Sequence, residues 1–288
     1  MTLITSPANP RISKLKDLHT TRGRKKSGFF LMEGPNLLET LFDMHLLPHE
    51  IYYQPDYLQR TTKGKALLQR LLHTPGIGDE QRVEVSERVI EAISDTVTSQ
   101  GVVSVLPLEA FQEEKVRVRR TQHSLTTPAE VQRPALLILD AIADPGNMGT
   151  ILRTALATDV DTVLLTPNCV DCYSPKVVRA AAGTHLLLPI VSDVAWATIA
   201  ENIHTHCQGA MRVFLAEAGS PALYYKQDLV RPFALIVGNE AHGPSPEAHS
   251  LATTSITIPL ANSVESLNVA MATGIVLYEA VRQRQGDI

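Results

Sequence analysis

The chain is 288 residues long, 44% of its residues are hydrophobic and 19% are charged, and its formal net charge is −4. This length and composition are typical of a globular protein with a sizeable core and, most simply, two domains. The charge excludes a globally basic nucleic-acid-binding protein, so any contact with RNA must depend on a local basic patch.

No run of about 18 apolar residues occurs in the sequence, and Met1–Arg11 lacks the basic and apolar regions of a secretory leader. The three cysteines, Cys169, Cys172 and Cys207, are too few for a disulfide framework. Cys169 and Cys172 form a C-x-x-C pair, but no second pair follows at the spacing of a zinc site, so we expect no metal. We predict a cytoplasmic protein that does not span a membrane, while an organelle address stays open.

The first 108 residues alternate predicted strands and helices, which indicates a small α/β domain. The pattern predicts strands at 29–32, 51–53, 83–85 and 102–106, and helices from 36, at 64–72 and at 86–93. Residues 109–133 are rich in charged and polar side chains and contain Thr126-Thr127-Pro128, so we interpret them as a linker.

Residues 134–288 form the second predicted domain, in which strands and helices alternate again. The pattern predicts strands at 135–139, 162–165, 186–190, 212–216, 234–238 and 256–258, and helices at 149–157, 175–182, 195–206 and 266–282. Such alternation predicts an α/β fold with a mostly parallel sheet that is covered on both faces.

A cluster of basic residues near the start of the chain is its best candidate for contact with a phosphate backbone. Only Asp17 and Glu33 oppose these charges, and a solvated helix face would look similar. We expect the RNA-binding residues to be Arg11, Lys14, Arg22, Arg24, Lys25 and Lys26.

The segment Asp144–Gly149 contains Asp-Pro-Gly-Asn, which in isolation indicates a turn. If a helix begins near Gly149, Arg153 lies about one turn into it and Asn147 lies just before it, so both side chains can face one cleft. An amide and a guanidinium there can hold a phosphate or a ribose. The alternative for Arg153 is an ordinary surface arginine.

Two further motifs follow in the second domain. Gly238-Asn239-Glu240 comes directly after an apolar run, so it is expected at the carboxyl end of a strand, where ligands of open α/β sheets bind. Ser266-Leu267-Asn268 opens a long helical pattern, and Ser266 is the expected N-cap. A solvated loop carboxylate is the alternative for Glu240, and capping alone is the alternative for Ser266.

Together these motifs resemble the SpoU, or TrmH, family of RNA ribose 2'-O-methyltransferases over nearly the whole chain. The segment from Asn9-Pro10 through Gly23-Arg24, followed by Phe29–Gly34, is similar to the family's N-terminal substrate-binding domain. Val170–Lys176 with Arg179-Ala180 is also similar to the family. The resemblance implies a trefoil-knotted (SPOUT) parallel-sheet domain, bound S-adenosylmethionine and a homodimer.

Carried onto this sequence, the resemblance implies a catalytic or substrate-positioning set and a cofactor-binding set. The first set is Asn147, Arg153, Glu240, Ser266 and Asn268, and the second set, which acts through its backbone, is Gly238, Ile258 and Leu267. The sequence departs from the family pattern at Ala241–Pro244 and at Ala181.

The implied reaction is methylation of a ribose 2'-hydroxyl without a metal, and it depends on positioning. Because a guanidinium stays protonated in proteins, we expect Arg153 to grip a phosphate rather than to act as a base. The N-terminal domain favours ribosomal RNA of the large subunit over transfer RNA. The alternatives are a tRNA methyltransferase, a non-catalytic RNA-binding or ribosome-assembly factor, and a metabolic α/β enzyme.

Overall fold

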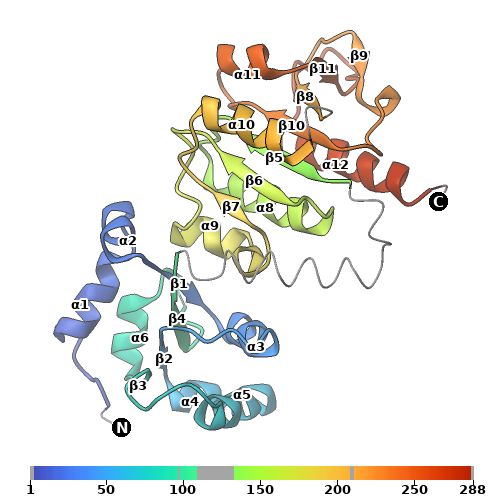
Figure 1. Cartoon of the computed structure of the whole chain (residues 1–288). Coiled ribbons are helices and arrows are strands. Elements are labelled where there is room, and N and C mark those ends of the chain that lie inside the picture. Colours follow the sequence, from blue (N-terminus) through green and yellow to red (C-terminus); the bar gives the residue numbers. More distant parts are fainter. Residues whose placement is uncertain (1–2, 97, 109–132, 208–210, 287–288) are drawn as a thin grey trace. The chain divides into compact units, whose positions relative to one another are not determined.

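The computed structural model describes residues 3–96, 98–108, 133–207 and 211–286 (Figure 1). Its contacts form two compact units. The first unit contains the described residues of Met1–Phe111 together with Tyr173–Gly183, and the second contains the other described residues. The predicted boundaries at 108 and 134 stay a prediction, and the sequence pattern did not assign Tyr173–Gly183 to the first unit. Most of the predicted linker lies outside the described residues.

The first unit is built on a four-stranded sheet in the order β1-β4-β2-β3. β1 (Phe29–Glu33) and β2 (Glu50–Tyr53) run antiparallel to β4 (Val102–Pro107), and β3 (Arg82–Glu84) runs parallel to β2. All four strands agree with the sequence pattern to within about one residue.

Helices complete the first unit. The apolar stripes of α1 (Pro10–Asp17) and α6 (Glu87–Ile93) join the strands in one buried cluster that includes Ile12, Ile90 and Val103. The remaining helices of the unit are α2 (Thr21–Ser27), α3 (Pro35–Asp43), α4 (Pro55–Leu58), α5 (Thr62–His73) and α9 (Pro175–Ala180).

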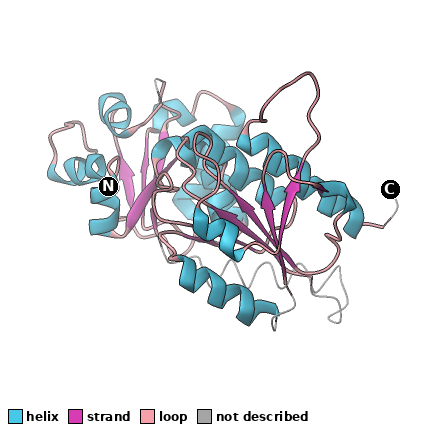
Figure 2. Ribbon diagram, turned by 90° about the horizontal axis from the view of Figure 1, so that it is seen from above, coloured by secondary structure: helices cyan, strands magenta, loops and turns pink. Residues whose placement is uncertain are grey.

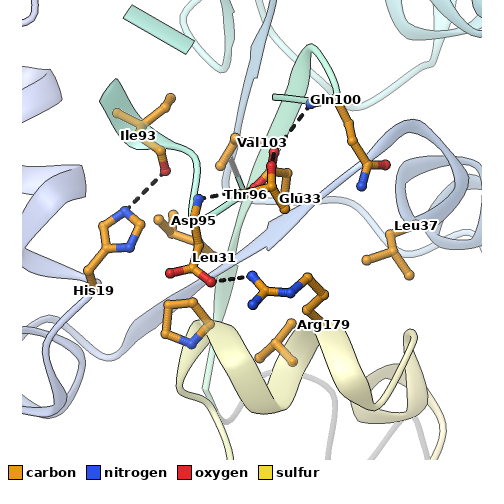
Figure 3. Close-up of a pocket in the computed structure, with 12 residues that line it drawn as sticks. His19, Leu31, Glu33, Leu37, Ile93, Asp95, Thr96, Gln100, Val103 and Arg179 are labelled. Atoms are coloured by element: carbon orange, nitrogen blue, oxygen red, sulfur yellow. Dashed lines mark hydrogen bonds and ion pairs between the residues drawn. The ribbon is translucent and has the colours of Figure 1, made fainter. Parts of the chain in front are cut away.

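A small cavity of the first unit lies beside β1 and α9, and several of its polar side chains are paired (Figure 3). The Glu33 carboxylate accepts hydrogen bonds from Thr96 Oγ1 at 2.6 Å and from the Asp95 and Gln100 backbone N–H groups at 3.2 and 3.3 Å. Asp95 forms an ion pair with Arg179 of α9. This ion pair links α9 to the rest of the first unit.

The second unit is built on a seven-stranded sheet in which every neighbouring pair is parallel, so the predicted parallel sheet is confirmed. The strands, in spatial order, are β7 (Ile190–Val191), β6 (Thr162–Leu165), β5 (Ala135–Leu139), β10 (Phe233–Val237), β8 (Arg212–Ala216), β11 (Thr254–Thr257) and β9 (Ala222–Leu223).

Every residue of β5 and of β10 is buried, as expected for central strands covered on both faces. Figure 2, in which strands are magenta and helices cyan, shows helices on both sides of this sheet. One cluster packs α10 (Trp196–Cys207) and α11 (Pro246–Leu251) against alternate strand residues such as Ile138 and Ile236. α8 (Pro145–Ala157) and α12 (Val269–Arg284) pack against each other.

Three predicted elements of this unit were wrong in their bounds or type. α8 begins at Pro145, four residues early, because Asp144 caps it and proline suits a first helical position. α12 begins at Val269 instead of Ser266. The predicted strand 186–190 is a 3₁₀ helix, Thr184–Leu186, followed by the two-residue β7, since Leu187 and Leu188 donate back to Thr184 and Pro189 has no N–H for a ladder.

Candidate active site

The first two motifs of the second unit leave the sheet at the same edge. β5 and β10 are parallel neighbours in which Leu139 pairs with Val237, so Asp140 and Gly238 both follow the carboxyl ends of their strands. Ligands of parallel α/β sheets bind beyond these ends. The candidate site therefore lies where sheets of this type bind their ligands.

Three of the predicted catalytic residues form a hydrogen-bonded chain at this edge. Asn268 Nδ2 donates to Asn147 Oδ1 at 2.9 Å, and Asn147 Nδ2 donates to Glu240 Oε1 at 3.0 Å. These residues are 121 and 93 positions apart along the chain. The fold thus brings one residue of each motif into a single cluster, which we call the amide–carboxylate cluster (Asn147, Glu240 and Asn268).

The N-cap of α12 determines the direction of the hydrogen bonds in the cluster. Asn268, not Ser266, is the N-cap of this helix, and its Oδ1 accepts from the backbone N–H groups of Ala270 and Met271 at 3.0 and 3.2 Å. Its Nδ2 is therefore the group left to face Asn147. Because Asn147 must accept at Oδ1, its own Nδ2 is turned toward Glu240.

Glu240 is an exposed residue, yet its carboxylate is held on several sides. Oε1 accepts from Asn147, and Oε2 accepts from the backbone N–H of Ala143 at 3.3 Å. Partial burial acts to raise the pKa of Glu240, but hydrogen bonds from Asn147 and from nearby backbone N–H groups outweigh it and lower the pKa below its usual value. Glu240 is thus an ionised hydrogen-bond acceptor at neutral pH.

Arg153 and Ser266 lie outside the cluster. Both are exposed, and within the described residues neither side chain makes a hydrogen bond or an ion pair. On α8, Arg153 follows Asn147 by six positions, which turns it roughly 120° around the helix axis. The guanidinium is thus open to a ligand that comes from solvent.

The predicted cofactor-binding residues adjoin strand ends and the cluster. Val237 of β10 and Ile256 of β11 both pair with Ala216 of β8, so the ends of β10 and β11 flank the end of β8. Gly238 directly follows β10, and Ile258 directly follows β11. Leu267 is half-buried and directly precedes Asn268. These three positions present main-chain groups and small or apolar side chains.

Only glycine fits at position 238. A Cβ added there would lie 2.5 Å from the backbone nitrogen of Pro244, a contact that the backbone must move to relieve. The reason is that the chain folds back on itself, with Asn239 and Gly243 bridged as a short antiparallel pair.

The predicted RNA-binding residues of the first unit divide into two groups. Arg24 is 2% exposed and donates to Leu18 O at 2.7 Å, which satisfies a carbonyl at the end of α1. Arg11 donates to Glu50 at 2.7 Å and to the Tyr52 hydroxyl at 2.8 Å. The residues that are exposed are Lys14 on α1 and Arg22, Lys25 and Lys26 on α2.

Two residues that support the site carried no predicted role. Asp140 is 4% exposed and accepts from the Ser245 backbone N–H at 2.7 Å. Asn239 donates to the Ala141 carbonyl at 2.7 Å. Asp140 is the first residue after β5 and Asn239 is the second after β10. A polar residue just beyond a buried strand is a signal that could have identified both. In the described ranges, no group of three or more His, Cys, Asp or Glu residues is placed to hold a metal.

Two sequence profiles match the chain, that of the SpoU rRNA Methylase family over residues 134–278 and that of the MRM3-like substrate binding domain over residues 9–104. An uncharacterized tRNA/rRNA methyltransferase of Synechocystis sp. is 36% identical over 98% of this chain and 94% of its own length. The 23S rRNA (guanosine(2553)-2'-O)-methyltransferase RlmP of Bacillus subtilis is 30% identical over 96% of this chain and 98% of its own length.

Solved structures agree with these relatives. An AdoMet-bound rRNA methyltransferase of Sinorhizobium meliloti is 25% identical, covers 98% of each chain and has a TM-score of 0.76. The predicted fold class and the predicted family are thereby confirmed: the chain belongs to the SpoU rRNA methylase family.

Proposed function

We propose that this chain methylates a ribose 2'-hydroxyl in RNA, with S-adenosylmethionine as the methyl donor. The observation that carries the proposal is the amide–carboxylate cluster, in which one residue from each of three distant motifs meets at the ligand-binding edge of a parallel sheet. Relatives whose names state rRNA 2'-O-methylation align over nearly the whole chain, which supports the same chemistry here.

The residues at the strand ends fit S-adenosylmethionine. Main-chain groups beside Gly238 and Ile258, with the apolar side chains of Ile258 and Leu267, are the type of lining that binds a purine and its ribose. Their placement on both sides of the end of β8 supports this assignment. When bound, S-adenosylmethionine supplies an electrophilic methyl group. These three residues would hold it, and none of them has to ionise.

The other site residues orient the RNA. Arg153 holds the phosphate next to the target ribose, because an exposed guanidinium binds phosphate with two parallel hydrogen bonds. Asn147 and Glu240 fix the 2'-hydroxyl by hydrogen bonds, with Asn268 holding the Asn147 amide in place. As the hydroxyl oxygen bonds to the methyl carbon, the carbon–sulfur bond of the sulfonium would break and a neutral thioether would leave. The hydroxyl proton would be released late, to water, so alignment provides much of the rate.

We further propose that the substrate is 23S-type ribosomal RNA. The match of residues 9–104 to a substrate-binding domain and the 23S rRNA activity named for the Bacillus relative support this choice. Transfer RNA is the second candidate, because the Synechocystis relative is named for both RNA classes. The exposed residues Lys14, Arg22, Lys25 and Lys26 are the proposed phosphate contacts of the first unit.

A homodimer and a trefoil knot stay predictions from the resemblance. Support for the dimer comes from α12, on which Met271 is 60% exposed and Tyr278 is 55% exposed. Because these residues are seven positions apart, they share one face of the helix. An exposed apolar face of this kind is typical of a surface that another subunit covers.

The cytoplasmic location is likewise a prediction. In the part of the chain that the structure describes, no helix combines the length and the apolar character that a membrane span needs.

The experiment that tests the function is transfer of a labelled methyl group from S-adenosylmethionine to separate pools of unmodified ribosomal and transfer RNA, followed by alkaline hydrolysis. Label in alkali-resistant dinucleotides of the ribosomal pool is the expected result. The same label only in transfer RNA would correct the substrate. No transfer to either pool would overturn the enzymatic proposal and favour an RNA-binding factor.

A further inference from the structure

Ala141, the second residue after β5, is held in a strained conformation from two sides. Its φ is 55°, in the left-handed region that residues with a Cβ rarely adopt. Its N–H donates to Thr166 Oγ1 at 3.0 Å, and its carbonyl accepts from Asn239 Nδ2 at 2.7 Å. Side chains from the ends of β6 and β10 therefore over-determine this turn, as expected where strain serves a site.

Asn239 uses the other end of its side chain within its own loop. Oδ1 accepts from the backbone N–H groups of Ala241 and His242 at 2.9 and 3.0 Å. One amide thus has two separate tasks: its oxygen shapes the loop that carries Glu240, and its nitrogen ties that loop to the Ala141 turn.

The tie has a direct geometric consequence for Glu240. Ala143, two residues beyond Ala141, gives the backbone N–H that binds Glu240 Oε2. Asn147, which binds Oε1, lies in the first turn of the helix that begins at Pro145. Ala143 and Asn147, which donate to the Glu240 carboxylate, therefore both lie just beyond Ala141, the residue that Asn239 contacts.

A second contact fixes the far end of the same loop. The buried Asp140 carboxylate accepts from the Ser245 backbone N–H at 2.7 Å, and Thr166 Oγ1 lies 3.4 Å from its other oxygen. Asp140 and Ala141 are consecutive, so the loop 239–245 is anchored at its two ends to two adjacent residues, through the Asp140 side chain and the Ala141 carbonyl. A shift of the Asn239 anchor is therefore expected to move Glu240 relative to Asn147.

We propose that Asn239 is a positioning residue of the methyl-transfer site, whose Nδ2–Ala141 O bond sets the Glu240 carboxylate against Asn147 and the Ala143 N–H. This inference rests on the proposed function for its kinetic consequence, but the geometric tie can be tested without turnover. It assigns to Asn239 a role distinct from shaping its own loop.

Asn239→Asp separates the two tasks. The aspartate keeps an oxygen that accepts from Ala241 and His242, but it loses the donor and brings a carboxylate oxygen against the Ala141 carbonyl. Asn239→Ala removes both tasks. If Asn239 only shapes its loop, the aspartate variant keeps wild-type activity; if the tie matters, it is impaired as the alanine variant is.

Asn202→Asp is the matched control. Asn202 of α10 also donates through Nδ2 to a backbone carbonyl, that of Thr198 at 2.8 Å, and it belongs to the same unit but to no motif of the site. The same atom exchange there removes a comparable hydrogen bond without touching the site. It is expected to leave kcat unchanged.

The kinetic readout is kcat and the KM values for RNA and S-adenosylmethionine. We expect Asn239→Asp to lower kcat on the order of tenfold, with a smaller change in both KM values, since misalignment of the reacting groups acts mainly on the transition state. The ratio of variant to wild-type kcat should recover as the pH falls, because a protonated aspartic acid can again donate to Ala141. Division by the wild-type rate removes the pH effects that are common to the two proteins.

The second readout is hydrogen exchange of the peptide 140–147 in the full chain without ligands. Asn239→Asp should speed exchange in this peptide, while Asn202→Asp should not. Wild-type exchange and wild-type kcat in Asn239→Asp would overturn the proposal. If the wild type itself transfers no methyl group, the enzymatic function is refuted. Faster exchange in Asn239→Asp than in that wild type would still support the hydrogen bond between Asn239 and Ala141. If the aspartate variant does not fold, Asn239→Ser, whose short hydroxyl can still accept within the loop but cannot reach Ala141, takes its place.

Discussion

Asn268 and Asn147 join the N-terminal ends of two helices through one side-chain hydrogen bond, from Nδ2 to Oδ1 at 2.9 Å. Asn268 caps α12, and Asn147 lies in the first turn of α8. The two helices also pack against each other. The cap of one helix therefore determines how the Asn147 amide of the other is oriented.

Asn268→Asp should inactivate the protein without unfolding it. Aspartate is as good an N-cap as asparagine, so Ala270 and Met271 keep their acceptor. Because aspartate has no Nδ2, a carboxylate oxygen would face Asn147 Oδ1. The repulsion favours a flip of the Asn147 amide, which breaks the hydrogen bond from Asn147 to Glu240. We expect a fall in methyl transfer of about tenfold or more, measured as kcat, with an unchanged thermal midpoint.

Asn268→Ala is the companion variant, because it removes the cap as well. It should cost about 1 kcal/mol of unfolding free energy in addition to the lost activity. If Asn268→Asp turns over as fast as the wild type, the orientation of Asn147 does not depend on the cap.

Asn147→Ala should change the pH dependence of stability through Glu240. Asn147 is one of the hydrogen-bond donors that lower the pKa of this carboxyl. A carboxyl with a lowered pKa stabilises the fold above its unfolded pKa of about 4.3, and this contribution is lost as the pH falls through the folded pKa. The part of the destabilisation that comes from Glu240 should therefore be largest near pH 7 and shrink below about pH 4.

Urea unfolding of Asn147→Ala and wild type at a series of pH values measures this difference. The variant should also lose methyl transfer while it still binds S-adenosylmethionine. A difference in unfolding free energy that is constant with pH would show that Asn147 does not act on Glu240. Complete failure to fold would favour a purely structural role for the Asp144–Gly149 segment.

The sequence could predict that the motifs of the candidate site follow strands or begin helices, because the determinants of these elements are local. Each motif adjoins a buried strand or an amphipathic helix, and apolar runs such as Phe233–Val237 predict such elements well. The parallel sheet follows from alternation of strands and helices. These features depend on residues close together in the chain.

The roles of individual polar residues did not follow, since they depend on partners far away in sequence. Ser266 and Asn268 are both residue types that cap helices well. In the structure Asn268 is the cap, and its Nδ2 also donates to Asn147, a contact that the sequence does not reveal. Arg24 was predicted from the basic run to bind RNA, yet its side chain is buried and donates to the Leu18 carbonyl. Charge and spacing do not encode such tertiary contacts.

Arg153→Lys should keep RNA binding and lose turnover. Lysine retains the charge of the exposed arginine but not the planar fork that grips a phosphate with two hydrogen bonds. We expect kcat to fall on the order of tenfold or more while the Kd for RNA changes little, because one charge among several contacts sets little of the affinity. Near-full turnover with unchanged RNA affinity would exclude the fork-like role.

The basic residues of α2 should separate into structural and RNA-binding members. The double variant Lys25→Ala, Lys26→Ala removes two exposed charges, so its affinity should fall for every RNA sequence. The slope of log K against log salt concentration should become shallower by up to about 1 for each phosphate contact that is lost. Arg24→Ala should instead lower the free energy of unfolding, since it removes a buried donor from the Leu18 carbonyl. Filter binding of unmodified ribosomal RNA at several salt concentrations, together with urea unfolding of both variants, measures the two effects. An unchanged salt slope in the double lysine variant would place the RNA-binding surface elsewhere on the protein. An unchanged free energy of unfolding in Arg24→Ala would contradict the structural role assigned to the Arg24 guanidinium.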